Sequence, residues 1–218
     1  ISPETGSGQY LRQLIAPLVA LRPGAKFVLL LPPDGDGLHL PQSSRLPPTV
    51  YPEVVPVPQA LAGTSLAKVY WEQVGVPRAL RRLDVDMLHV PYWAPPLLGA
   101  IPTVVTVHDL IPLLLPAYRG SLAVRFYTTL VRLATSRADF ILADSEASRR
   151  DIIHHLCVSP ERVRRVWLAV DPAYQPDPCD DDDAHLQALG LSPGYLLYLG
   201  GFDRRKNLVV IFKTLARL

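Results

Sequence analysis

Apolar runs of strand length alternate along this chain with stretches of helical periodicity. Lys26–Leu31 (KFVLLL) and Pro102–Val107 (PTVVTV) are short apolar runs, whereas Tyr10–Leu21 repeats its apolar residues at the three- and four-residue spacing of an amphipathic helix. Repeated strand-then-helix units are typical of a parallel sheet covered by helices on both faces. The chain is therefore predicted to have an α/β fold.

Further segments continue this alternation. Strands are predicted over Asp86–Val90, Phe140–Ala143, Val163–Val170 and Tyr195–Leu199, and helices over Leu66–Leu83, Ser121–Arg137, Ser145–Leu156 and from Asn207 onward. The long helix carries large apolar residues on one side: Leu122, Phe126, Leu130 and Leu133. Pro32–Pro58 is rich in proline, which lacks the N–H that a helix needs, so a loop with one short edge strand is expected there.

Size and charge limit the classes of protein to which this chain can belong. Its 218 residues, 49% of them hydrophobic, suffice for one α/β domain with part of another. The 22 basic and 20 acidic residues give a formal charge of +2, without the basic excess of a nucleic-acid-binding protein. No apolar run approaches the ~20 residues that span a bilayer, and Ile1–Gly8 lacks the pattern of a signal peptide.

The cysteines and the single methionine bear on the compartment and on the start of the chain. Cys157 and Cys179 are too few for a disulfide framework, so a reducing, cytoplasmic setting is expected. Because the only methionine is Met87, Ile1 is not expected to be a native start. The sequence is interpreted as a fragment or a processed chain.

The composition changes between Asp171 and Leu191, where the chain becomes acidic and proline-bearing. This stretch predicts a crossing between two domains, with the first over residues 1–172 and the start of the second over residues 173–218. No strand precedes the glycine turn at Gly6, so the first strand of the first domain is expected to be missing.

Two glycine turns precede helices. Glycine lets a backbone approach a ligand closely, and a helix start favours an anion. Gly6–Gly8 alone is a weak signal, since such a turn is often an ordinary one. Gly200–Gly201 end an apolar run, and Arg205 and Lys206 precede the next helix, a combination that suits a diphosphate at the carboxyl end of a strand. The alternative is a solvated basic loop.

A polar pair, His108 and Asp109, follows the strand that ends at Val107. Ligands bind outside the carboxyl ends of strands in open α/β sheets, so this pair is a candidate for ligand contact. The alternative is a histidine that only caps the strand end. Ser145 follows a later strand and is interpreted as the N-cap of the next helix.

Three other clusters are weighed and set aside. The residues HHLC at 154–157 have no matching cluster elsewhere, and Asp180–Asp183 lies between proline turns rather than at a strand end, so no metal site is predicted. Arg125 and Arg132 lie one heptad apart on the long helix and are a weak indication of contact with anionic lipid.

Seven segments, taken in order, resemble the retaining glycosyltransferases of family 4: GSGQYLRQL, WEQVGVPRAL, DMLHVPYWAPPL, TVVTVHDLIPLLLPAY, ADFILADSEASRRDI, VSPERVRRVWLAVDPAYQP and YLLYLGGFDRRKNL. They run from Gly6 to Leu208, so the resemblance covers essentially the whole chain, and the ordered set is specific although each segment is only suggestive. The resemblance implies the GT-B fold, with a Rossmann-like parallel sheet covered by helices on both faces in an acceptor-side first domain. The first βα unit of a second Rossmann-like domain, which binds the nucleotide sugar, would follow.

The resemblance implies roles for individual residues. His108 resembles the family histidine that reaches the transferred sugar, and it is the expected catalytic residue. The residues expected to bind the donor are Gly8, Gly200, Gly201, Arg205 and Lys206. The last two would clamp the diphosphate and stabilise the charge of the leaving nucleotide. Gly201 departs from the family pattern, which often has a basic or hydroxyl residue there, and the family's glutamate pair lies beyond Leu218.

The acceptor side is less defined by the resemblance. The residues expected to contact the acceptor are Gly6, Tyr10 and Tyr92, although core packing is an equally good interpretation of Tyr92. Trp71 and Glu72 belong to a family-like helix whose role is interpreted as structural.

The function that the resemblance implies is transfer of a sugar from a nucleotide-diphosphate donor to a saccharide or lipid-linked acceptor, with retention of configuration. No metal and no other cofactor is expected. Acceptors of this family often belong to polysaccharide biosynthesis, so a cytoplasmic location at the inner face of the cell membrane, with peripheral membrane contact, is expected. These 218 residues alone are expected to be inactive, because half of the donor site lies outside them.

Two other classes stay open. One is a non-catalytic module that binds an acceptor or acts as a scaffold. The other is an NAD(P)-dependent oxidoreductase of the Rossmann type, which fits less well. GSGQYL lacks the third glycine of the dinucleotide-binding motif, and no acidic residue follows at the required distance.

Overall fold

The computed structural model describes residues 6–33, 47–99, 101–171, 174, 177, 179, 181–192 and 194–217. The chain divides into two compact units, Ile1–Asp171 and Pro172–Leu218. This division lies next to the predicted domain boundary. That the second unit begins a nucleotide-sugar-binding domain stays a prediction.

The strands of the first unit pair in parallel throughout the described residues. β1 (Phe27–Leu31) pairs with β2 (Val50–Val54), and a second sheet has the order β3-β4-β5-β6. The strands of this second sheet are β3 (Leu88–Val90), β4 (Thr103–Val107), β5 (Phe140–Ala143) and β6 (Val163–Arg165). Parallel strands joined through helices confirm the predicted α/β class.

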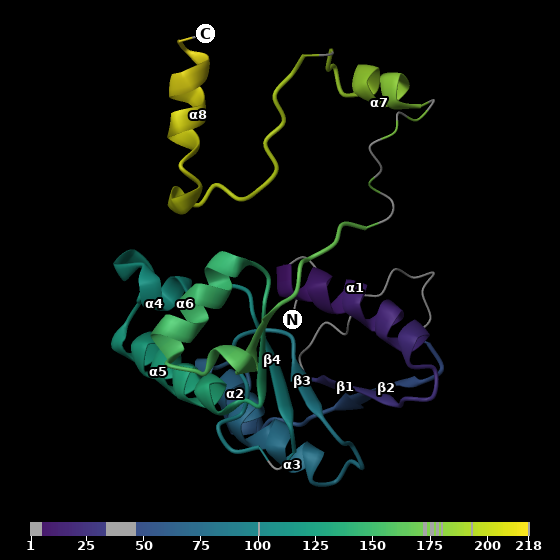
Figure 1. Cartoon of the computed structure of the whole chain (residues 1–218), viewed down its shortest axis with the longest axis vertical. Coiled ribbons are helices and arrows are strands. Elements are labelled where there is room, and N and C mark those ends of the chain that lie inside the picture. Colours follow the sequence, from purple (N-terminus) through teal and green to yellow (C-terminus); the bar gives the residue numbers. More distant parts are fainter. Residues whose placement is uncertain are drawn as a thin grey trace. The chain divides into compact units, whose positions relative to one another are not determined.

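Helices precede β1 and lie between β2 and β3, between β4 and β5, and between β5 and β6. Those of the first unit are α1 (Gly6–Leu21), α2 (Ser65–Tyr70), α3 (Val76–Leu80), α4 (Ile111–Leu114), α5 (Leu122–Arg137) and α6 (Glu146–Leu156). A π turn over Trp71–Gly75 joins α2 to α3. In Figure 1, α4, α5 and α6 lie together on one side of β3 and β4, and β1 and β2 lie on the other.

The core of the first unit is centred on β4 and β5. Val105, Val107, Ile141 and Ala143 are inaccessible to solvent, and Ile152 of α6 packs against them. Mainly apolar, buried central strands are typical of a parallel sheet with both faces covered. The sheet therefore holds the carboxyl ends of its central strands in fixed positions.

Local sequence explains where the helices on this sheet begin. Ser121 caps α5 and Ser145 caps α6, each with its hydroxyl accepting a hydrogen bond from the backbone N–H three residues later. The interpretation of Ser145 as an N-cap is thereby confirmed. Pro52 lies within β2, whose place beside β1 at a sheet edge tolerates the missing N–H. The part of Pro32–Pro58 over residues 34–46 lies outside the described residues.

The predicted apolar side of the long helix does not face the core. Leu122 is 79% exposed and Phe126 is 75% exposed, whereas α5 buries Val131, Ala134 and Thr135 instead. Small and β-branched side chains let the helix approach the sheet closely, and the bulkier side chains are turned to solvent. Periodicity alone could not choose between these two faces, because both carry apolar residues.

Two predicted strands also differ from the structure. The strand expected over Val163–Val170 ends at Arg165, and Val166 to Val170 are exposed. Tyr195–Leu199 does not form a strand, because no described segment of the second unit pairs with it to satisfy its backbone groups. The described helices of that unit are α7 (Asp182–Ala188) and α8 (Leu208–Leu215).

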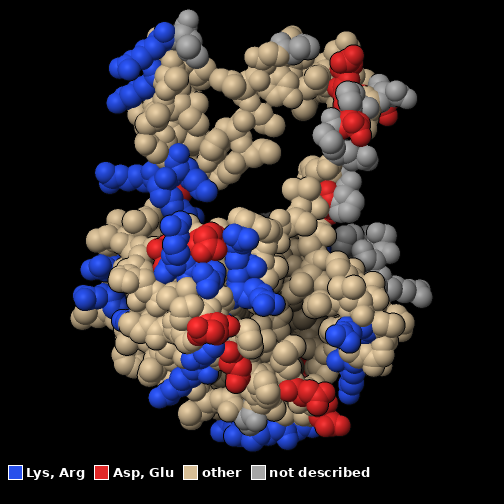
Figure 2. Space-filling view, viewed as in Figure 1, with Lys and Arg blue, Asp and Glu red and all other residues tan. Residues whose placement is uncertain are grey.

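Surface charge and helix hydropathy bear on the expected partners. Figure 2 shows Lys and Arg side chains interspersed with Asp and Glu side chains on the face drawn, rather than gathered into one basic area. Within the part of the chain that is described, no helix has the length and apolar character needed to cross a bilayer.

Candidate functional site

Three residues that directly follow neighbouring strands meet at one edge of the sheet. β3 is followed by Pro91, β4 by His108 and β5 by Asp144, and these strands are adjacent in the sheet. Because the strands are parallel, their carboxyl ends lie at the same edge. The three residues therefore lie close together, although they are far apart in the sequence.

His108 is held from both sides of its ring. Its Nδ1 lies 2.7 Å from Oδ2 of Asp144, and its Nε2 lies 3.1 Å from the carbonyl oxygen of Pro91. Both neighbours are acceptors, so a neutral imidazole donates to only one of them, and a protonated ring donates to both. The side chains of His108 and Asp144 are 24% and 19% exposed, so the pair is accessible to a ligand.

The backbone of His108 is also fixed. Its carbonyl oxygen accepts a hydrogen bond of 3.1 Å from the hydroxyl of Ser148 in the first turn of α6. Ser148 in turn donates its backbone N–H to the capping hydroxyl of Ser145. The start of α6 therefore positions the histidine that follows β4.

Tyr10 of α1 lies against the ring of His108. The two ring centroids are 5.1 Å apart and the rings are nearly perpendicular, at 81°. The Tyr10 hydroxyl shares a hydrogen bond of 3.2 Å with Oγ1 of Thr106. Burial raises the pKa of Tyr10, the Thr106 hydrogen bond opposes this, and the charge of Asp144 raises it further. The tyrosine therefore stays neutral beside His108 at neutral pH.

A second histidine, His89, contacts Thr106 and Tyr10 of this group. Nε2 of His89 on β3 is 2.9 Å from Oγ1 of Thr106, and the His89 ring meets the Tyr10 ring edge-on at a centroid distance of 6.4 Å. Burial lowers the pKa of His89, because the charged ring would lose its hydration. His89 is therefore neutral at pH 7, and it supports Tyr10 through Thr106.

The first glycine turn has a different structure from the one predicted. Gly6 and Gly8 belong to α1 itself, which begins at Gly6 rather than near Tyr10. Gly8 is buried, and Gly6 is exposed with open space where a Cβ would stand. Both precede Tyr10 in the first turns of the helix that contacts His108. Their expected roles at donor and acceptor stay predictions.

Tyr92 is not part of the group around His108. Its hydroxyl donates a hydrogen bond of 3.3 Å to Oε1 of Glu72, and its ring packs against the core. Of the two interpretations left open by the sequence, the structure shows core packing. The phenolic oxygen can still accept a hydrogen bond while it donates to Glu72, so the expected acceptor contact of Tyr92 stays a prediction.

The remaining predicted donor residues belong to the second unit. Gly200 has φ of +150°, and a Cβ there would lie 2.8 Å from the Tyr198 hydroxyl, so the position requires glycine. That hydroxyl donates a hydrogen bond of 2.8 Å to the carbonyl oxygen of Gly201. Arg205 and Lys206 lie in a 3₁₀ turn over Arg204–Lys206 that precedes α8.

Asp203 caps this basic turn. Its Oδ1 accepts a hydrogen bond of 2.9 Å from the backbone N–H of Arg205 and lies 3.6 Å from Nε of the same arginine. The guanidinium of Arg205 is therefore held by a carboxylate that the sequence interpretation did not weigh. An anionic ligand at Arg205 would compete with this carboxylate or would share the arginine with it.

Asp144 is the site residue that the sequence interpretation missed. The sequence interpretation considered Ser145, which is an N-cap, whereas Asp144 directly before it is hydrogen-bonded to His108. A usable signal was present, since Asp144 follows β5 as His108 follows β4 and the two strands are neighbours. His89 and Thr106 lie inside strands, where sequence provides no comparable signal.

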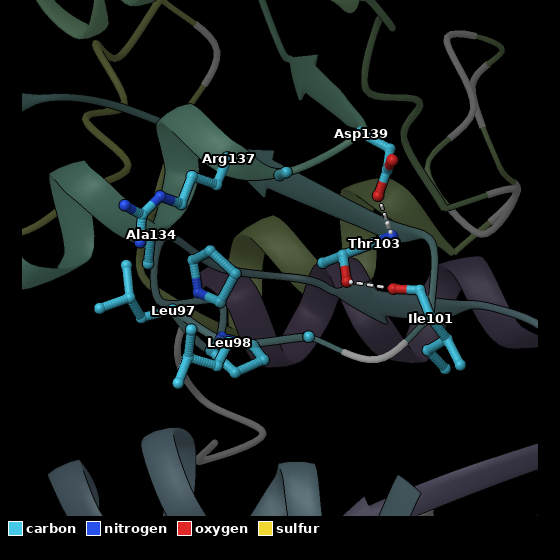
Figure 3. A pocket seen from close by; sticks show the side chains of 11 residues that line it. Leu97, Leu98, Ile101, Thr103, Ala134, Arg137 and Asp139 are labelled. Atoms are coloured by element: carbon cyan, nitrogen blue, oxygen red, sulfur yellow. Dashed lines mark hydrogen bonds between the residues drawn. The ribbon is translucent and has the colours of Figure 1, made fainter. Parts of the chain in front are cut away.

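A separate hollow lies at the amino edge of the same sheet. It has a volume of about 450 Å³ and is lined in part by Leu97, Leu98, Thr103, Arg137 and Asp139. In Figure 3, Asp139 lies over Thr103, whose backbone N–H donates to its carboxylate at 2.7 Å. Because Thr103 begins β4 and His108 follows its end, this hollow is not part of the His108 site.

Metal ligands do not gather in the part of the chain that the structure describes. No three His, Cys, Asp or Glu side chains among those residues are placed to hold a metal ion. His154 and His155 contact each other edge-on, with 4.7 Å between their ring centroids. The expectation that the protein needs no metal stays untested.

Comparison with known protein families gives a match over most of the chain. Residues 5–174 match the sequence model of a family described as Glycosyltransferase Family 4. No curated protein matches the chain. The matched range includes every residue of the group around His108.

Proposed function

This chain belongs to glycosyltransferase family 4, and from that premise we propose that it transfers a sugar from a nucleotide-diphosphate donor to a saccharide or lipid-linked acceptor. The proposal includes retention of configuration at the transferred sugar. It rests above all on His108, which lies between Asp144 and the carbonyl oxygen of Pro91 at the carboxyl ends of adjacent parallel strands.

The proposal assigns different roles to the cations and to the histidine. Departure of a nucleotide diphosphate develops negative charge on the phosphate oxygens, and fixed cations lower the energy of that state. Arg205 and Lys206 supply two such cations beside a glycine turn. His108, with Tyr10 against its ring, offers polar groups that would orient the sugar. The proposal assigns charge stabilisation to side chains rather than to a resident metal, and treatment of the active enzyme with EDTA would test that part.

Donor binding is expected to stabilise the full-length protein against heat. A nucleotide sugar at about 100 times its Kd adds about 2.7 kcal/mol of stability. We expect one donor among UDP-, GDP- and ADP-sugars to give this shift, and Arg205→Ala/Lys206→Ala to abolish it. The measurement is a thermal-shift series with each donor.

Arg204→Ala is the matched control, because Arg204 belongs to the same 3₁₀ turn and is not a predicted donor residue. If Arg204→Ala weakens donor binding as much as Arg205→Ala/Lys206→Ala does, the donor is attracted by the general positive charge of this turn rather than by specific contacts from Arg205 and Lys206. A shift with NAD but with no nucleotide sugar would favour an oxidoreductase. A shift with an acceptor glycan alone would favour a binding module.

A peripheral encounter with the cytoplasmic side of the membrane is part of the proposal, because lipid-linked acceptors lie there. The exposed face of α5 supports it: Leu122, Phe126 and Leu133 are exposed on a helix that has no acidic residue. The arginines exposed on the same helix are Arg125, Arg132 and Arg137. An apolar strip bordered by cations suits the surface of an anionic bilayer.

The chain is therefore expected to bind vesicles of phosphatidylglycerol and phosphatidylcholine more tightly than vesicles of phosphatidylcholine alone. Leu122→Ser/Phe126→Ser should weaken this binding by at least about tenfold, since each apolar side chain contributes about 1.5–3 kcal/mol when buried. Cosedimentation with the vesicles measures it. Leu66→Ser, at an exposed leucine of α2, is the control and should bind as the unaltered chain does. Equal binding to both kinds of vesicle would contradict the membrane part of the proposal.

A further inference from the structure

The π turn Trp71–Gly75 interrupts the helix between α2 and α3. Such turns are rare and recur at functional sites. Gly75 ends the turn, and a Cβ at this residue would lie 2.9 Å from Cγ1 of the buried Val55, closer than carbon atoms normally approach. The turn is therefore fixed against the segment that follows β2. It carries two polar residues, Glu72 and Gln73, toward the interior of the first unit.

Glu72 is a charged residue that is only 1% exposed. Its Oε2 accepts a hydrogen bond of 2.7 Å from the Tyr127 hydroxyl, and its Oε1 accepts one of 3.3 Å from the Tyr92 hydroxyl. Nζ of Lys68 lies 3.9 Å from Oε1. Burial raises the pKa of Glu72, while Tyr127, Lys68 and Tyr92 oppose that change. Burial of the Glu72 carboxyl group is unfavourable unless its oxygens are hydrogen-bonded. Loss of either tyrosine bond would therefore leave a buried oxygen without that partner and would cost free energy.

Gln73 holds a second part of the segment that begins with Tyr92. Its Nε2 donates a hydrogen bond of 3.2 Å to the carbonyl oxygen of Pro95, and its Oε1 accepts one of 2.8 Å from the backbone N–H of Leu97. The segment 91–97 is thus bound at Tyr92 by Glu72 and at its far end by Gln73. This segment has no regular secondary structure of its own, so these side-chain hydrogen bonds help to hold its path.

The same segment begins at the carbonyl group that faces His108. The oxygen of Pro91 lies 3.1 Å from Nε2 of the ring, and Pro91 directly precedes Tyr92. We propose that Glu72 and Gln73 are positioning residues, which set the orientation of the His108 ring through the segment 91–97. Insofar as the ring orientation matters for sugar transfer, the inference rests on the proposed function.

The expected consequence follows from the two sides of the ring. Asp144 holds Nδ1 from β5, and Pro91 holds Nε2 from the segment after β3. If the segment is released, Asp144 and the edge-on contact with Tyr10 remain, but Nε2 loses its partner and the ring rotates more freely about its side-chain bonds. A displacement of about 1 Å at a reacting group can cost a hundredfold in rate. The π turn would therefore act on the reaction without touching the substrate.

Two tyrosines allow a matched test, because each donates its hydroxyl to the same carboxylate. Tyr92→Phe removes the bond that holds the segment 91–97, and Tyr127→Phe removes the shorter bond to α5. The first readout is the ring ¹⁵N resonances of His108 in the chain itself, assigned by their loss in His108→Gln. We expect Tyr92→Phe and Gln73→Met to shift these resonances, and Tyr127→Phe to leave them unchanged.

The second readout is steady-state kinetics of the full-length protein. Tyr92→Phe and Gln73→Met should each lower kcat by about tenfold and leave the donor KM within about twofold, whereas Tyr127→Phe should change neither. If Tyr127→Phe moves the His108 resonances and kcat as far as Tyr92→Phe does, the network only supports the fold and the inference is wrong. Unchanged resonances in Tyr92→Phe and Gln73→Met would also overturn it. Shifted resonances in a protein that transfers no sugar would uphold the positioning and refute the proposed function.

Discussion

His108→Ala is expected to lower kcat for sugar transfer by roughly a thousandfold, because removal of one fixed polar group at a reacting centre costs about 10²–10³ in rate. The donor KM should change by less than about threefold, since the diphosphate is assigned to Arg205 and Lys206 rather than to the histidine. Steady-state kinetics of the full-length protein with saturating acceptor would measure both constants. A large rise in KM with kcat unchanged would assign His108 to binding alone.

The control for this substitution is another histidine of the same unit. His154→Ala removes an exposed ring near the end of α6 and should leave both constants unchanged. The kcat of Asp144→Asn should lie between those of His108→Ala and His154→Ala. The amide oxygen still accepts a hydrogen bond from Nδ1 of His108, but it carries no charge. If Asp144→Asn were silent, the carboxylate would not contribute through the histidine, and the group at this sheet edge would have to be assigned differently.

The sequence was sufficient to predict the layers of the first unit because its two central strands are short, mainly apolar runs separated by helical stretches. Pro102–Val107 and Phe140–Ala143 became the two central strands, and a surface strand would have alternated instead. The strand predicted at Tyr195–Leu199 did not form, since a strand depends on a partner that the apolar run itself does not encode. An apolar run therefore predicts a buried strand only where the rest of the fold supplies a partner for it.

The candidate site was predictable only where a polar residue follows a strand. His108 met that condition, and so did Asp144, although the sequence interpretation considered only Ser145 at that strand end. Thr106 and His89 do not meet it, because they lie within strands. They belong to the site because β3 pairs with β4, which brings the two side chains into contact beside Tyr10. The role of Glu72 was likewise hidden, since a glutamate within a helical stretch is usually solvated and nothing local marks the π turn.

Ile141→Ala is expected to lower the free energy of unfolding of the first unit by about 3–4 kcal/mol, as large-to-small substitutions in a packed core do. Ile141 is 0% exposed at the centre of the sheet, where its neighbours on β4 and α6 cannot collapse into the space that the lost side chain leaves. Phe126→Ala removes a larger side chain and should change stability by no more than about 0.5 kcal/mol, because Phe126 is already in water. Urea unfolding followed by far-UV circular dichroism, with the slope compared between variants, measures both.

Phe126→Ala also tests which apolar face of α5 is covered, because periodicity could not distinguish the two faces of that helix. The sequence places Phe126 among the large apolar residues on one side of the long helix. In the structure the helix packs through Val131 and Ala134 instead, so the Phe126 side chain is not needed for that packing. A cost of several kcal/mol for Phe126→Ala would mean that this face is covered in solution, and it would also remove the support that the exposed face gives to the membrane proposal. A small change in the free energy of unfolding would mean that the fold does not need this apolar, arginine-bordered face. The face would then be free to serve as a binding surface.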